Sequence, residues 1–513
     1  MRASAARIRI YGIALTITSM VWLLAGKGAG GSEVSRETIG TVSQGTAPEP
    51  QPGAASLPRA GITPGMTAGR ARSIAAGEPG AATYPMDGQS GAKFENDPNV
   101  VGRELNELVA QALGVNPTLA AARYAVVAAE ARVPPAGMPA DPLMGFRIKD
   151  MPTTFSWVRE NATEKQIEFQ QSYPFPGKLG LREEIAGKEA LVARADEEVE
   201  AFSLVDAVRL AFIDIFVVDK DIGLTLERQA MLRDLRDIAT SKYQVGPGLQ
   251  QDVLNADVAL ARLHSTLIEL ARRRESREIR LGVLLDRPSV AVNPLGVLPA
   301  GELTLEAGQI EEMALAANPR IRRLAQAVAR DELTVALARR APLPDMEFDA
   351  DYGLRNDATP FSAGKANPVT AVDRPDLLGA RIMFDMPVFY YWKQREQLAE
   401  VEANLNRTRS RLMAERDQTL GTLHDLMARY RQHAQVARSF EQEVLPLAHS
   451  SLAAAVSAYQ VDKVDFLTVL AAEEVLNNYE ADYWNNLAER FRDLVQIDDV
   501  AGGSVLAAGG ARP

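Results

Sequence analysis

The sequence predicts a mainly helical protein with a small β part, built from two copies of one structural unit. The segment ALGVNPTL at 112–119 returns as ALAANPRI at 314–321. The segment SKYQVGPGLQQDVLNADVAL at 241–260 returns as SAYQVDKVDFLTVLAAEEVL at 457–476. Each half also runs through helix, two short alternating strands and a very long helical hairpin. Such a duplication of about 200 residues suits a wall segment of a pseudo-symmetric tube better than a pocket.

Composition limits the function classes. The mean hydropathy of −0.12 argues against a bundle of transmembrane helices, and the net charge of −11 argues against nucleic acid as a partner. The chain has no cysteine, which excludes disulfides, thiolate metal sites and lipidation through an N-terminal cysteine.

Residues 1–30 are predicted to be a signal peptide. Arg2, Arg7 and Arg9 precede Ile10–Ala25, which carries no charge, and small residues follow. A transmembrane helix needs about 20 apolar residues, so a cleaved signal fits better than an inner-membrane anchor, which stays open as the alternative.

The rest of the chain divides by composition. Residues 31–96, rich in Gly, Ala and Pro, are predicted to be a disordered extension, and 501–513 a disordered tail. We expect the first structural repeat over 97–300 and the second over 301–500.

Each repeat opens with an alanine-rich helical pattern, over 104–132 and 304–340. Each pattern contains an Asn-Pro step. We expect Asn116 and Asn318 to be N-caps, with the following proline at the first helical position.

Two strands should follow in each half. Alternation of apolar and polar residues predicts strands over 143–149, 165–173, 346–354 and 378–388. Strands of about 10 residues cross an outer membrane when tilted, and an apolar-out, polar-in pattern is typical of a transmembrane barrel. A soluble antiparallel sheet with one wet face fits the alternation too.

Aromatic residues gather at the ends of these strands and suggest a membrane-interface girdle. The candidates are Tyr173, Phe175, Phe389, Tyr390, Tyr391 and Trp392, with Phe155 and Trp157 in the first loop. Because an open sheet cannot lie in lipid with unsatisfied edges, four membrane strands would make the protein an obligate oligomer.

The long helices carry coiled-coil-like spacing of apolar residues. In 181–243 only Gly187 and Gly223 interrupt the helical pattern, and the apolar spacing misses one position at Asp219. About 60 helical residues span roughly 90 Å, a length that suits a tunnel across the periplasm.

Over about 97–500 the chain resembles outer-membrane efflux channels of the TolC type. The resemblance is carried by the two AL-x-x-NP openings, the strand pairs, and the segments YQVGPGLQQDVLNA at 243–256 and YQVDKVDFLTVLAA at 459–472. Duplication of these features in the same order makes the signal specific.

The resemblance implies a homotrimer in the outer membrane with a large periplasmic part. Each chain would give four strands to a trimeric transmembrane β-barrel and its long antiparallel coiled-coil helices to an α-barrel. A periplasmic adaptor protein and an inner-membrane pump would be the partners, besides the lipid. The order of elements and Pro446 resemble most the branch that exports heavy-metal cations.

In this family the tips of the two hairpins close the periplasmic end of the tunnel, and carboxylates there favour cations. The candidate gate residues are Tyr243, Gly246, Asp252, Tyr459, Asp462, Asp465 and Thr468. The second tip departs from the family pattern, because Asp462 replaces the turn glycine and Thr468 stands where some members have aspartate. A structural alternative has the tyrosines packing between hairpins and Asp252 capping the returning helix.

No catalytic, cofactor or metal site is expected. The four histidines, His264, His424, His433 and His449, lie on predicted helices, and no HExxH, Walker or GxSxG motif is present in the folded part. The sequence therefore favours a passive duct for small solutes, either metal cations or drugs. A type I protein secretion conduit and a non-channel coiled-coil scaffold remain as alternatives.

Overall fold

The computed structural model describes residues 95–151, 153, 163–299, 303, 305–355 and 374–503. All of them belong to the second of two compact units, which spans 75–513. The predicted signal peptide, the extension up to residue 94, Phe155, Trp157 and the tail from 504 lie outside the described residues.

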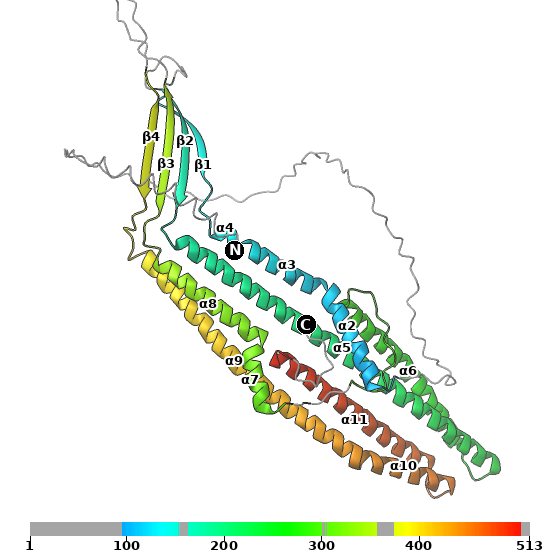
Figure 1. Cartoon of the computed structure of the whole chain (residues 1–513). Helices are drawn as coiled ribbons and strands as arrows, with labels where there is room; N and C mark the ends of the chain where they lie inside the picture. The colour runs from blue at the N-terminus through cyan, green and yellow to red at the C-terminus, as the bar shows by residue number, and fades with distance from the viewer. Residues whose placement is uncertain are drawn as a thin grey trace, which may run out of the picture. The chain divides into compact units, whose positions relative to one another are not determined.

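The described chain is mainly helical, with one four-stranded antiparallel sheet, as predicted. In chain order the elements are α2 (Pro98–Val115), α3 (Pro117–Ala131), α4 (Val133–Ala136), β1 (Leu143–Lys149), β2 (Glu164–Tyr173), α5 (Lys178–Val245), α6 (Gln250–Leu284), α7 (Ala307–Ala317), α8 (Pro319–Arg339), β3 (Met346–Arg355), β4 (Leu377–Phe384), α9 (Gln394–Ser439), the π-helical segment η2 (Phe440–Val444), α10 (Leu445–Gln460) and α11 (Phe466–Ala501). Figure 1 shows the strands together at one end of the helices and the two hairpin turns at the other.

The Asn-Pro steps are confirmed as helix caps. The side-chain oxygen of Asn116 accepts hydrogen bonds from the amides that open α3, and Asn318 does the same for α8. Each asparagine also ties its helix to the end of a long arm. Asn116 Nδ2 donates to the Leu284 carbonyl over 3.0 Å, and Asn318 Nδ2 to the Val500 carbonyl over 2.9 Å. The two acceptors stand at equivalent positions when the repeated hairpin segments are aligned.

The sheet has the order β1-β2-β3-β4, and its register places like residues on one face. Ile167 pairs with Tyr352, which pairs with Leu378. The fourth strand ends at Phe384, short of the predicted 388. Pro387 lacks the N–H that a ladder requires, so the apolar alternation outlasts the strand.

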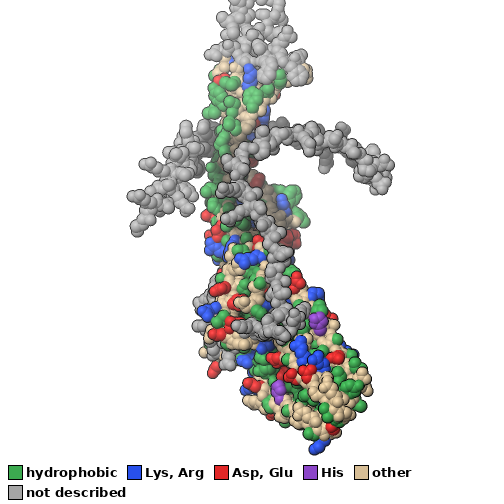
Figure 2. Space-filling model, turned by 90° about the vertical axis from the view of Figure 1, so that its right-hand side faces the viewer, with side chains coloured by type: hydrophobic (Ala, Val, Ile, Leu, Met, Phe, Trp, Pro, Cys, Tyr) green, Lys and Arg blue, Asp and Glu red, His purple; other side chains and the backbone are tan. Residues whose placement is uncertain are grey.

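One face of the sheet is apolar and exposed. It presents the side chains of Met144, Phe146, Ile167, Phe169, Tyr352, Leu378 and Ile382. The opposite face carries three cross-strand ion pairs, Arg147–Glu168 at 2.8 Å, Arg355–Glu164 at 2.6 Å and Arg381–Asp349 at 3.0 Å. Hydrophobic side chains are visible over the sheet in Figure 2.

The longest helix, α5, runs unbroken through 68 residues and passes both Gly187 and Gly223. That length corresponds to about 100 Å. Among the described residues, no helix is long and apolar enough to cross a membrane.

Asp219 interrupts the apolar spacing of α5 because it holds a buried ion pair. Its Oδ1 accepts from Arg274 Nε of α6 over 2.6 Å, and its Oδ2 from the Leu295 amide over 2.8 Å. Arg274 Nη2 also donates to the Val292 carbonyl over 2.7 Å. The pair thereby fixes residues 285–299, the strap, against the first hairpin.

The main core lies where α5 meets α2, the strap and α11. Phe212, Phe216, Leu295 and Val495 are fully buried there. Because α5 belongs to the first half and α11 to the second, this core joins the two halves.

Pro446 lies inside the long second-half arm without breaking it. The preceding turn is widened into the π-helical segment, where the Leu445 amide donates to the Phe440 carbonyl. The extra residue in that turn accommodates the proline ring and its missing N–H, so α10 continues the direction of α9 (Figure 1).

Candidate functional site

The two hairpin turns lie next to each other and are built on the same plan. Gly246, the C-cap of α5, has a φ of 109°, and Asp462, two residues after the end of α10, has a φ of 59°. Both positions therefore need the left-handed conformation, which glycine adopts freely and aspartate tolerates. Asp462 thus takes the place of the turn glycine, as the sequence indicated.

Lys242, in the last turn of α5, joins the first tip to the second. Its Nζ donates to the Tyr459 carbonyl over 2.5 Å and pairs with the Asp462 carboxylate. The same ammonium lies 4.2 Å from the centroid of the Tyr459 ring, a cation–π distance. Only 13% of the lysine side chain is exposed, so the contact is partly desolvated.

Tyr459 occupies the centre of the tips. It is 3% exposed, and its ring packs edge-on against Phe466 at 5.5 Å between centroids. Its hydroxyl donates to Asp252 Oδ2 over 3.1 Å. Burial raises the pKa of Tyr459, helped by the hydrogen bond to Asp252 and the charge of Asp462, so the hydroxyl stays a donor at neutral pH.

The alternative capping role of Asp252 was wrong. The N-cap of α6 is Leu249, which makes no side-chain cap hydrogen bond, and Asp252 lies in the first helical turn. Its carboxylate serves the contact with Tyr459 instead. A negative charge in that turn also suits the helix dipole.

Asp465 caps the returning helix of the second tip. Its Oδ1 accepts from the Thr468 amide over 3.0 Å and from the Thr468 hydroxyl. The hydrogen bonds from Thr468 hold the pKa of Asp465 below its ordinary value. Asp465 and Thr468 therefore form a local cap, separate from the Tyr459 contact.

The two tyrosines of the repeated YQV segments differ. Tyr459 is buried, whereas Tyr243 is 48% exposed. The structure brings Asp252, Tyr459 and Asp462 together, leaves Tyr243 outside the cluster, and adds Lys242. We call Lys242, Asp252, Tyr459 and Asp462 the tip cluster.

Lys242 was missed by sequence reasoning. The signal that could have found it is its counterpart Ala458, which stands at the same place in the otherwise similar second segment. Where one repeat has a charged residue and the aligned position of the other has alanine, the charged residue makes a contact that its counterpart cannot make.

Above the tip cluster, a buried ion pair links the two hairpins. Arg228 Nε of α5 lies 2.6 Å from Glu473 Oε1 of α11, and the Glu473 side chain is 1% exposed. Burial raises the pKa of Glu473 above its ordinary value, while Arg228 opposes that shift. Glu473 therefore faces the seam between the hairpins.

The predicted interface aromatics lie at the helical end of the sheet. Tyr173 ends β2, its ring 5.9 Å from that of Phe348, and the Phe175 amide donates to Asp345 Oδ1 over 2.7 Å. The aromatic residues between β4 and α9 are all exposed, namely Phe389, Tyr390, Tyr391 and Trp392. The structure thus places these six residues at the same end of the sheet, and their role at a membrane interface stays a prediction.

Within the described ranges, no three His, Cys, Asp or Glu side chains gather as a metal ion would require. Three of the histidines face carboxylates one at a time. His424 lies 2.9 Å from Glu311, His433 2.7 Å from Asp493 and His449 3.4 Å from Glu480.

No protein-family model and no curated protein matches the sequence. Solved structures of outer-membrane channels share its fold. The outer-membrane channel OprN is 17% identical with a TM-score of 0.63, covering 82% of this chain and 96% of its own. CusC is 16% identical with a TM-score of 0.65, covering 80% and 95%. The outer membrane protein VceC of Vibrio cholerae is 17% identical with a TM-score of 0.64, covering 80% and 100%.

Proposed function

We propose that the protein is the outer-membrane channel of a tripartite efflux system, a passive duct that carries small solutes to the exterior. The two halves are structural repeats, each giving two strands and one hairpin to the duct. The cargo class is metal cations or drugs. Heavy-metal cations are favoured because the order of elements and Pro446 resemble the branch of channels that exports them. The energy comes from an inner-membrane pump joined through a periplasmic adaptor, so the chain itself performs no catalysis.

The observation that carries the proposal is the two-faced sheet. Its apolar face is exposed, although water disfavours a patch that joins Met144, Phe169 and Leu378. Lipid suits such a face, and the ion-paired opposite face suits an aqueous lumen.

The edges of the sheet argue for several copies. Among the described strands, β1 pairs only with β2, and β4 only with β3. In lipid those edges must be satisfied, and the smallest bacterial barrels have about eight strands. A homotrimer in which β4 of one chain meets β1 of the next closes the barrel.

The tip cluster then serves as the periplasmic gate. Lys242 and Asp252 of the first hairpin hold Tyr459 of the second, so the tips cannot separate while these contacts persist. The carboxylates of Asp252 and Asp462 give the entrance an acidic lining that favours cations. Tyr243, which is exposed, is left for contacts with a neighbouring chain or the adaptor.

A pair of matched substitutions tests the membrane assignment. Ile167→Arg puts a charge on the apolar face of β2, whereas Gln170→Arg puts the same charge on the polar face of the same strand. A charge on the lipid face costs about 2–4 kcal/mol near the bilayer midplane. We expect Ile167→Arg to lower the yield of detergent-stable trimer in outer membranes, with Gln170→Arg close to the unmodified protein.

Equal yields for the two variants would contradict the membrane role of this face. A mature protein that stays monomeric and soluble without detergent would favour the coiled-coil scaffold. Neighbouring genes for an adaptor and a metal-type pump would support the cargo assignment, whereas genes of a protein secretion system would overturn it.

A further inference from the structure

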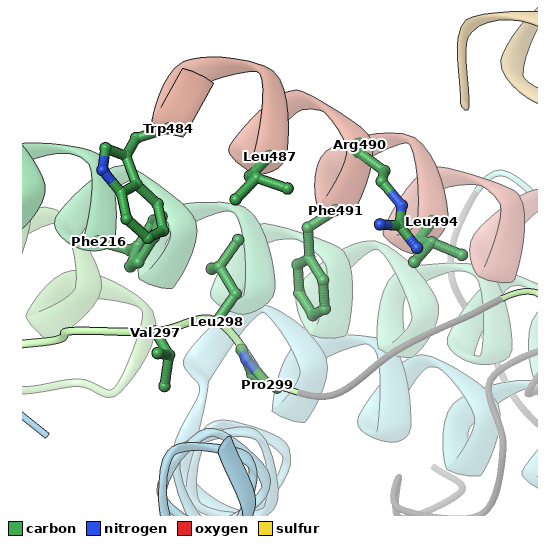
Figure 3. Close-up of a pocket in the computed structure, with 9 residues that line it drawn as sticks. All are labelled: Phe216, Val297, Leu298, Pro299, Trp484, Leu487, Arg490, Phe491 and Leu494. Atoms are coloured by element: carbon green, nitrogen blue, oxygen red, sulfur yellow. The ribbon is translucent and has the colours of Figure 1, made fainter. Parts of the chain in front are cut away.

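A cavity of about 220 Å³ lies between α5, α11 and the end of the strap. Figure 3 shows Leu487, Arg490 and Leu494 projecting from α11 toward it, with Leu298 and Pro299 of the strap on the opposite side. Its walls are apolar except for the guanidinium of Arg490, which also donates to the Tyr430 hydroxyl over 3.2 Å.

In the first half, the arginine at the position equivalent to Arg490 is Arg274, and it binds the strap. Arg274 of α6 donates to the Val292 carbonyl over 2.7 Å, and Val292 is 3% exposed. Asp286, the second residue of the strap, has the left-handed conformation at φ of 52°. The strap then runs back along α6, so that Val292 lies against Arg274 and Glu278.

The second half repeats these features as far as the structure describes it. When the repeated hairpin segments are aligned, Arg490 falls at the position of Arg274. Gly502, which ends α11 with φ of 67°, falls at the position of Asp286. Both long arms therefore end in the same left-handed turn, with an arginine at the same distance before it.

The sequences that follow the two turns are also alike. Ser289-Val290-Ala291-Val292 of the strap, which begins three residues after Asp286, resembles Ser504-Val505-Leu506-Ala507 of the C-terminal tail, residues 504–513. The tail segment begins two residues after Gly502, so the similarity requires a shift of one residue between the halves. In the strap this segment supplies the buried Val292 side chain and the carbonyl that Arg274 binds. The tail offers apolar side chains and carbonyls in the same order.

We propose that the C-terminal tail docks in this cavity as the strap docks on the first hairpin. Val505 and Leu506 contact the apolar wall near Leu494, and a backbone carbonyl at Ala507 or Ala508 accepts from Arg490. A guanidinium has five N–H donors, so this bond is compatible with the one to Tyr430.

The tail is long enough to reach the cavity. From Gly503 back to Leu487 the α11 axis rises about 24 Å, since each helical residue adds about 1.5 Å. Six extended residues cover about 20 Å, which places Gly509 within side-chain reach of Leu487. The docking does not depend on the channel function proposed above.

Disulfide formation in the cysteine-free chain tests the docking. The double variant Leu487→Cys/Gly509→Cys should form an intrachain disulfide in most molecules under mild oxidation, read by mass spectrometry of linked peptides. The matched control is Glu489→Cys/Gly509→Cys. Glu489 is nearer to Gly503 along the helix but about 200° around it from Leu487, facing away from the cavity.

A link at least tenfold more efficient for Leu487 than for Glu489 supports the proposal. Equal linking at both sites would overturn it, because it would show a freely moving tail. A linked dimer on a denaturing gel would overturn it as well, since the tail would then occupy a second copy.

Hydrogen exchange on the unmodified full-length protein gives a second test that needs no substitution at the cavity. Amides of residues 505–508 should exchange at least tenfold more slowly than in the free peptide of the same sequence. Exchange at the free-peptide rate would overturn the proposal, whatever the outcome of the disulfide experiment.

Discussion

The two repeats make equivalent contacts at one end of the hairpins and different contacts at the other. At the framework end, Asn116 and Asn318 make the same contacts in both halves, each binding the carbonyl near the end of a long arm. At the tips the halves diverge, since Lys242 and Asp252 have Ala458 and Thr468 as counterparts. Equivalent contacts build a wall from repeated parts, whereas the unlike tips form a contact in which the two hairpins have distinct roles.

The largest expected effect is on the buried ion pair of the first half. Arg274→Ala leaves the buried Asp219 carboxylate without its guanidinium and should destabilise the protein by about 3–5 kcal/mol. The counterpart substitution Arg490→Ala removes the hydrogen bond to the Tyr430 hydroxyl and the bond to the tail carbonyl proposed above, neither of them to a charged partner, and should cost about 1–2 kcal/mol. Thermal unfolding of the purified protein measures both, and equal losses would contradict the difference between the halves at this position.

Substitution of the asparagine should cost the two Asn-Pro steps a similar amount of stability. Asn116→Ala and Asn318→Ala each remove an N-cap and a hydrogen bond to a backbone carbonyl at the end of a long arm, for a loss of about 2 kcal/mol. Thermal unfolding of the two single variants measures the losses side by side. Losses that differ by more than about 1 kcal/mol would break the equivalence of the framework ends.

Asp206 of α5 lies near the end of α11 and should make the stability of the protein depend on pH. Burial, with the nearby charge of Asp499, raises the pKa of Asp206 to about 8. The native state then binds a proton that the unfolded state releases near pH 4, so this stabilisation is complete below about pH 4 and is lost as pH rises toward 8.

Asp206→Asn should remove that pH dependence. We expect its melting temperature to exceed that of the unmodified protein by a margin that grows from pH 5 to pH 8. Glu189→Gln, on α5 outside this cluster, serves as the control and should show no such trend. A margin that stays constant over this range would contradict the raised pKa of Asp206.

The tip cluster should matter least for stability and most for gating. Lys242→Ala removes the contacts to Tyr459 and Asp462 at a cost of about 1 kcal/mol, because the tips are partly solvated. It should raise the open probability of single channels in planar bilayers several-fold. Tyr243→Phe, at the exposed tyrosine of the same turn, is the control and should leave the open probability unchanged.

Asp252→Asn separates charge from contact at the same site. The amide still accepts from the Tyr459 hydroxyl, so the contact is retained while the charge is lost. Block of the conductance by divalent cations should weaken, and Thr468→Val at the counterpart position should leave it unchanged. Unaltered block in Asp252→Asn would restrict Asp252 to a structural role.

Much of the fold could be predicted from local signals. The caps at Asn116 and Asn318 and the limits of β1 follow from neighbouring residues in the chain. Such features are decided by backbone chemistry within a few residues, which is why periodicity and turn residues suffice to find them. The place of Asp462 at the turn-glycine position came from the family resemblance instead.

Contacts between residues that are far apart in the sequence could not be predicted in this way. Tyr459 and Asp252 lie far apart in the sequence, and Asp219 meets Arg274 only because α5 and α6 fold back on each other. The strand predicted to 388 ends at Phe384, paired with the first residue of β3, although apolar alternation continues to Val388. Pro387 has no N–H with which to extend the ladder. Partner identity and strand pairing therefore needed the structure.

The most direct test of the central claim is single-channel recording of the purified protein in planar bilayers, together with its mass in detergent. We expect a trimer that produces discrete conductance steps, with Lys242→Ala open more often than the unmodified channel. A monomer that gives no conductance step in either form would contradict the account.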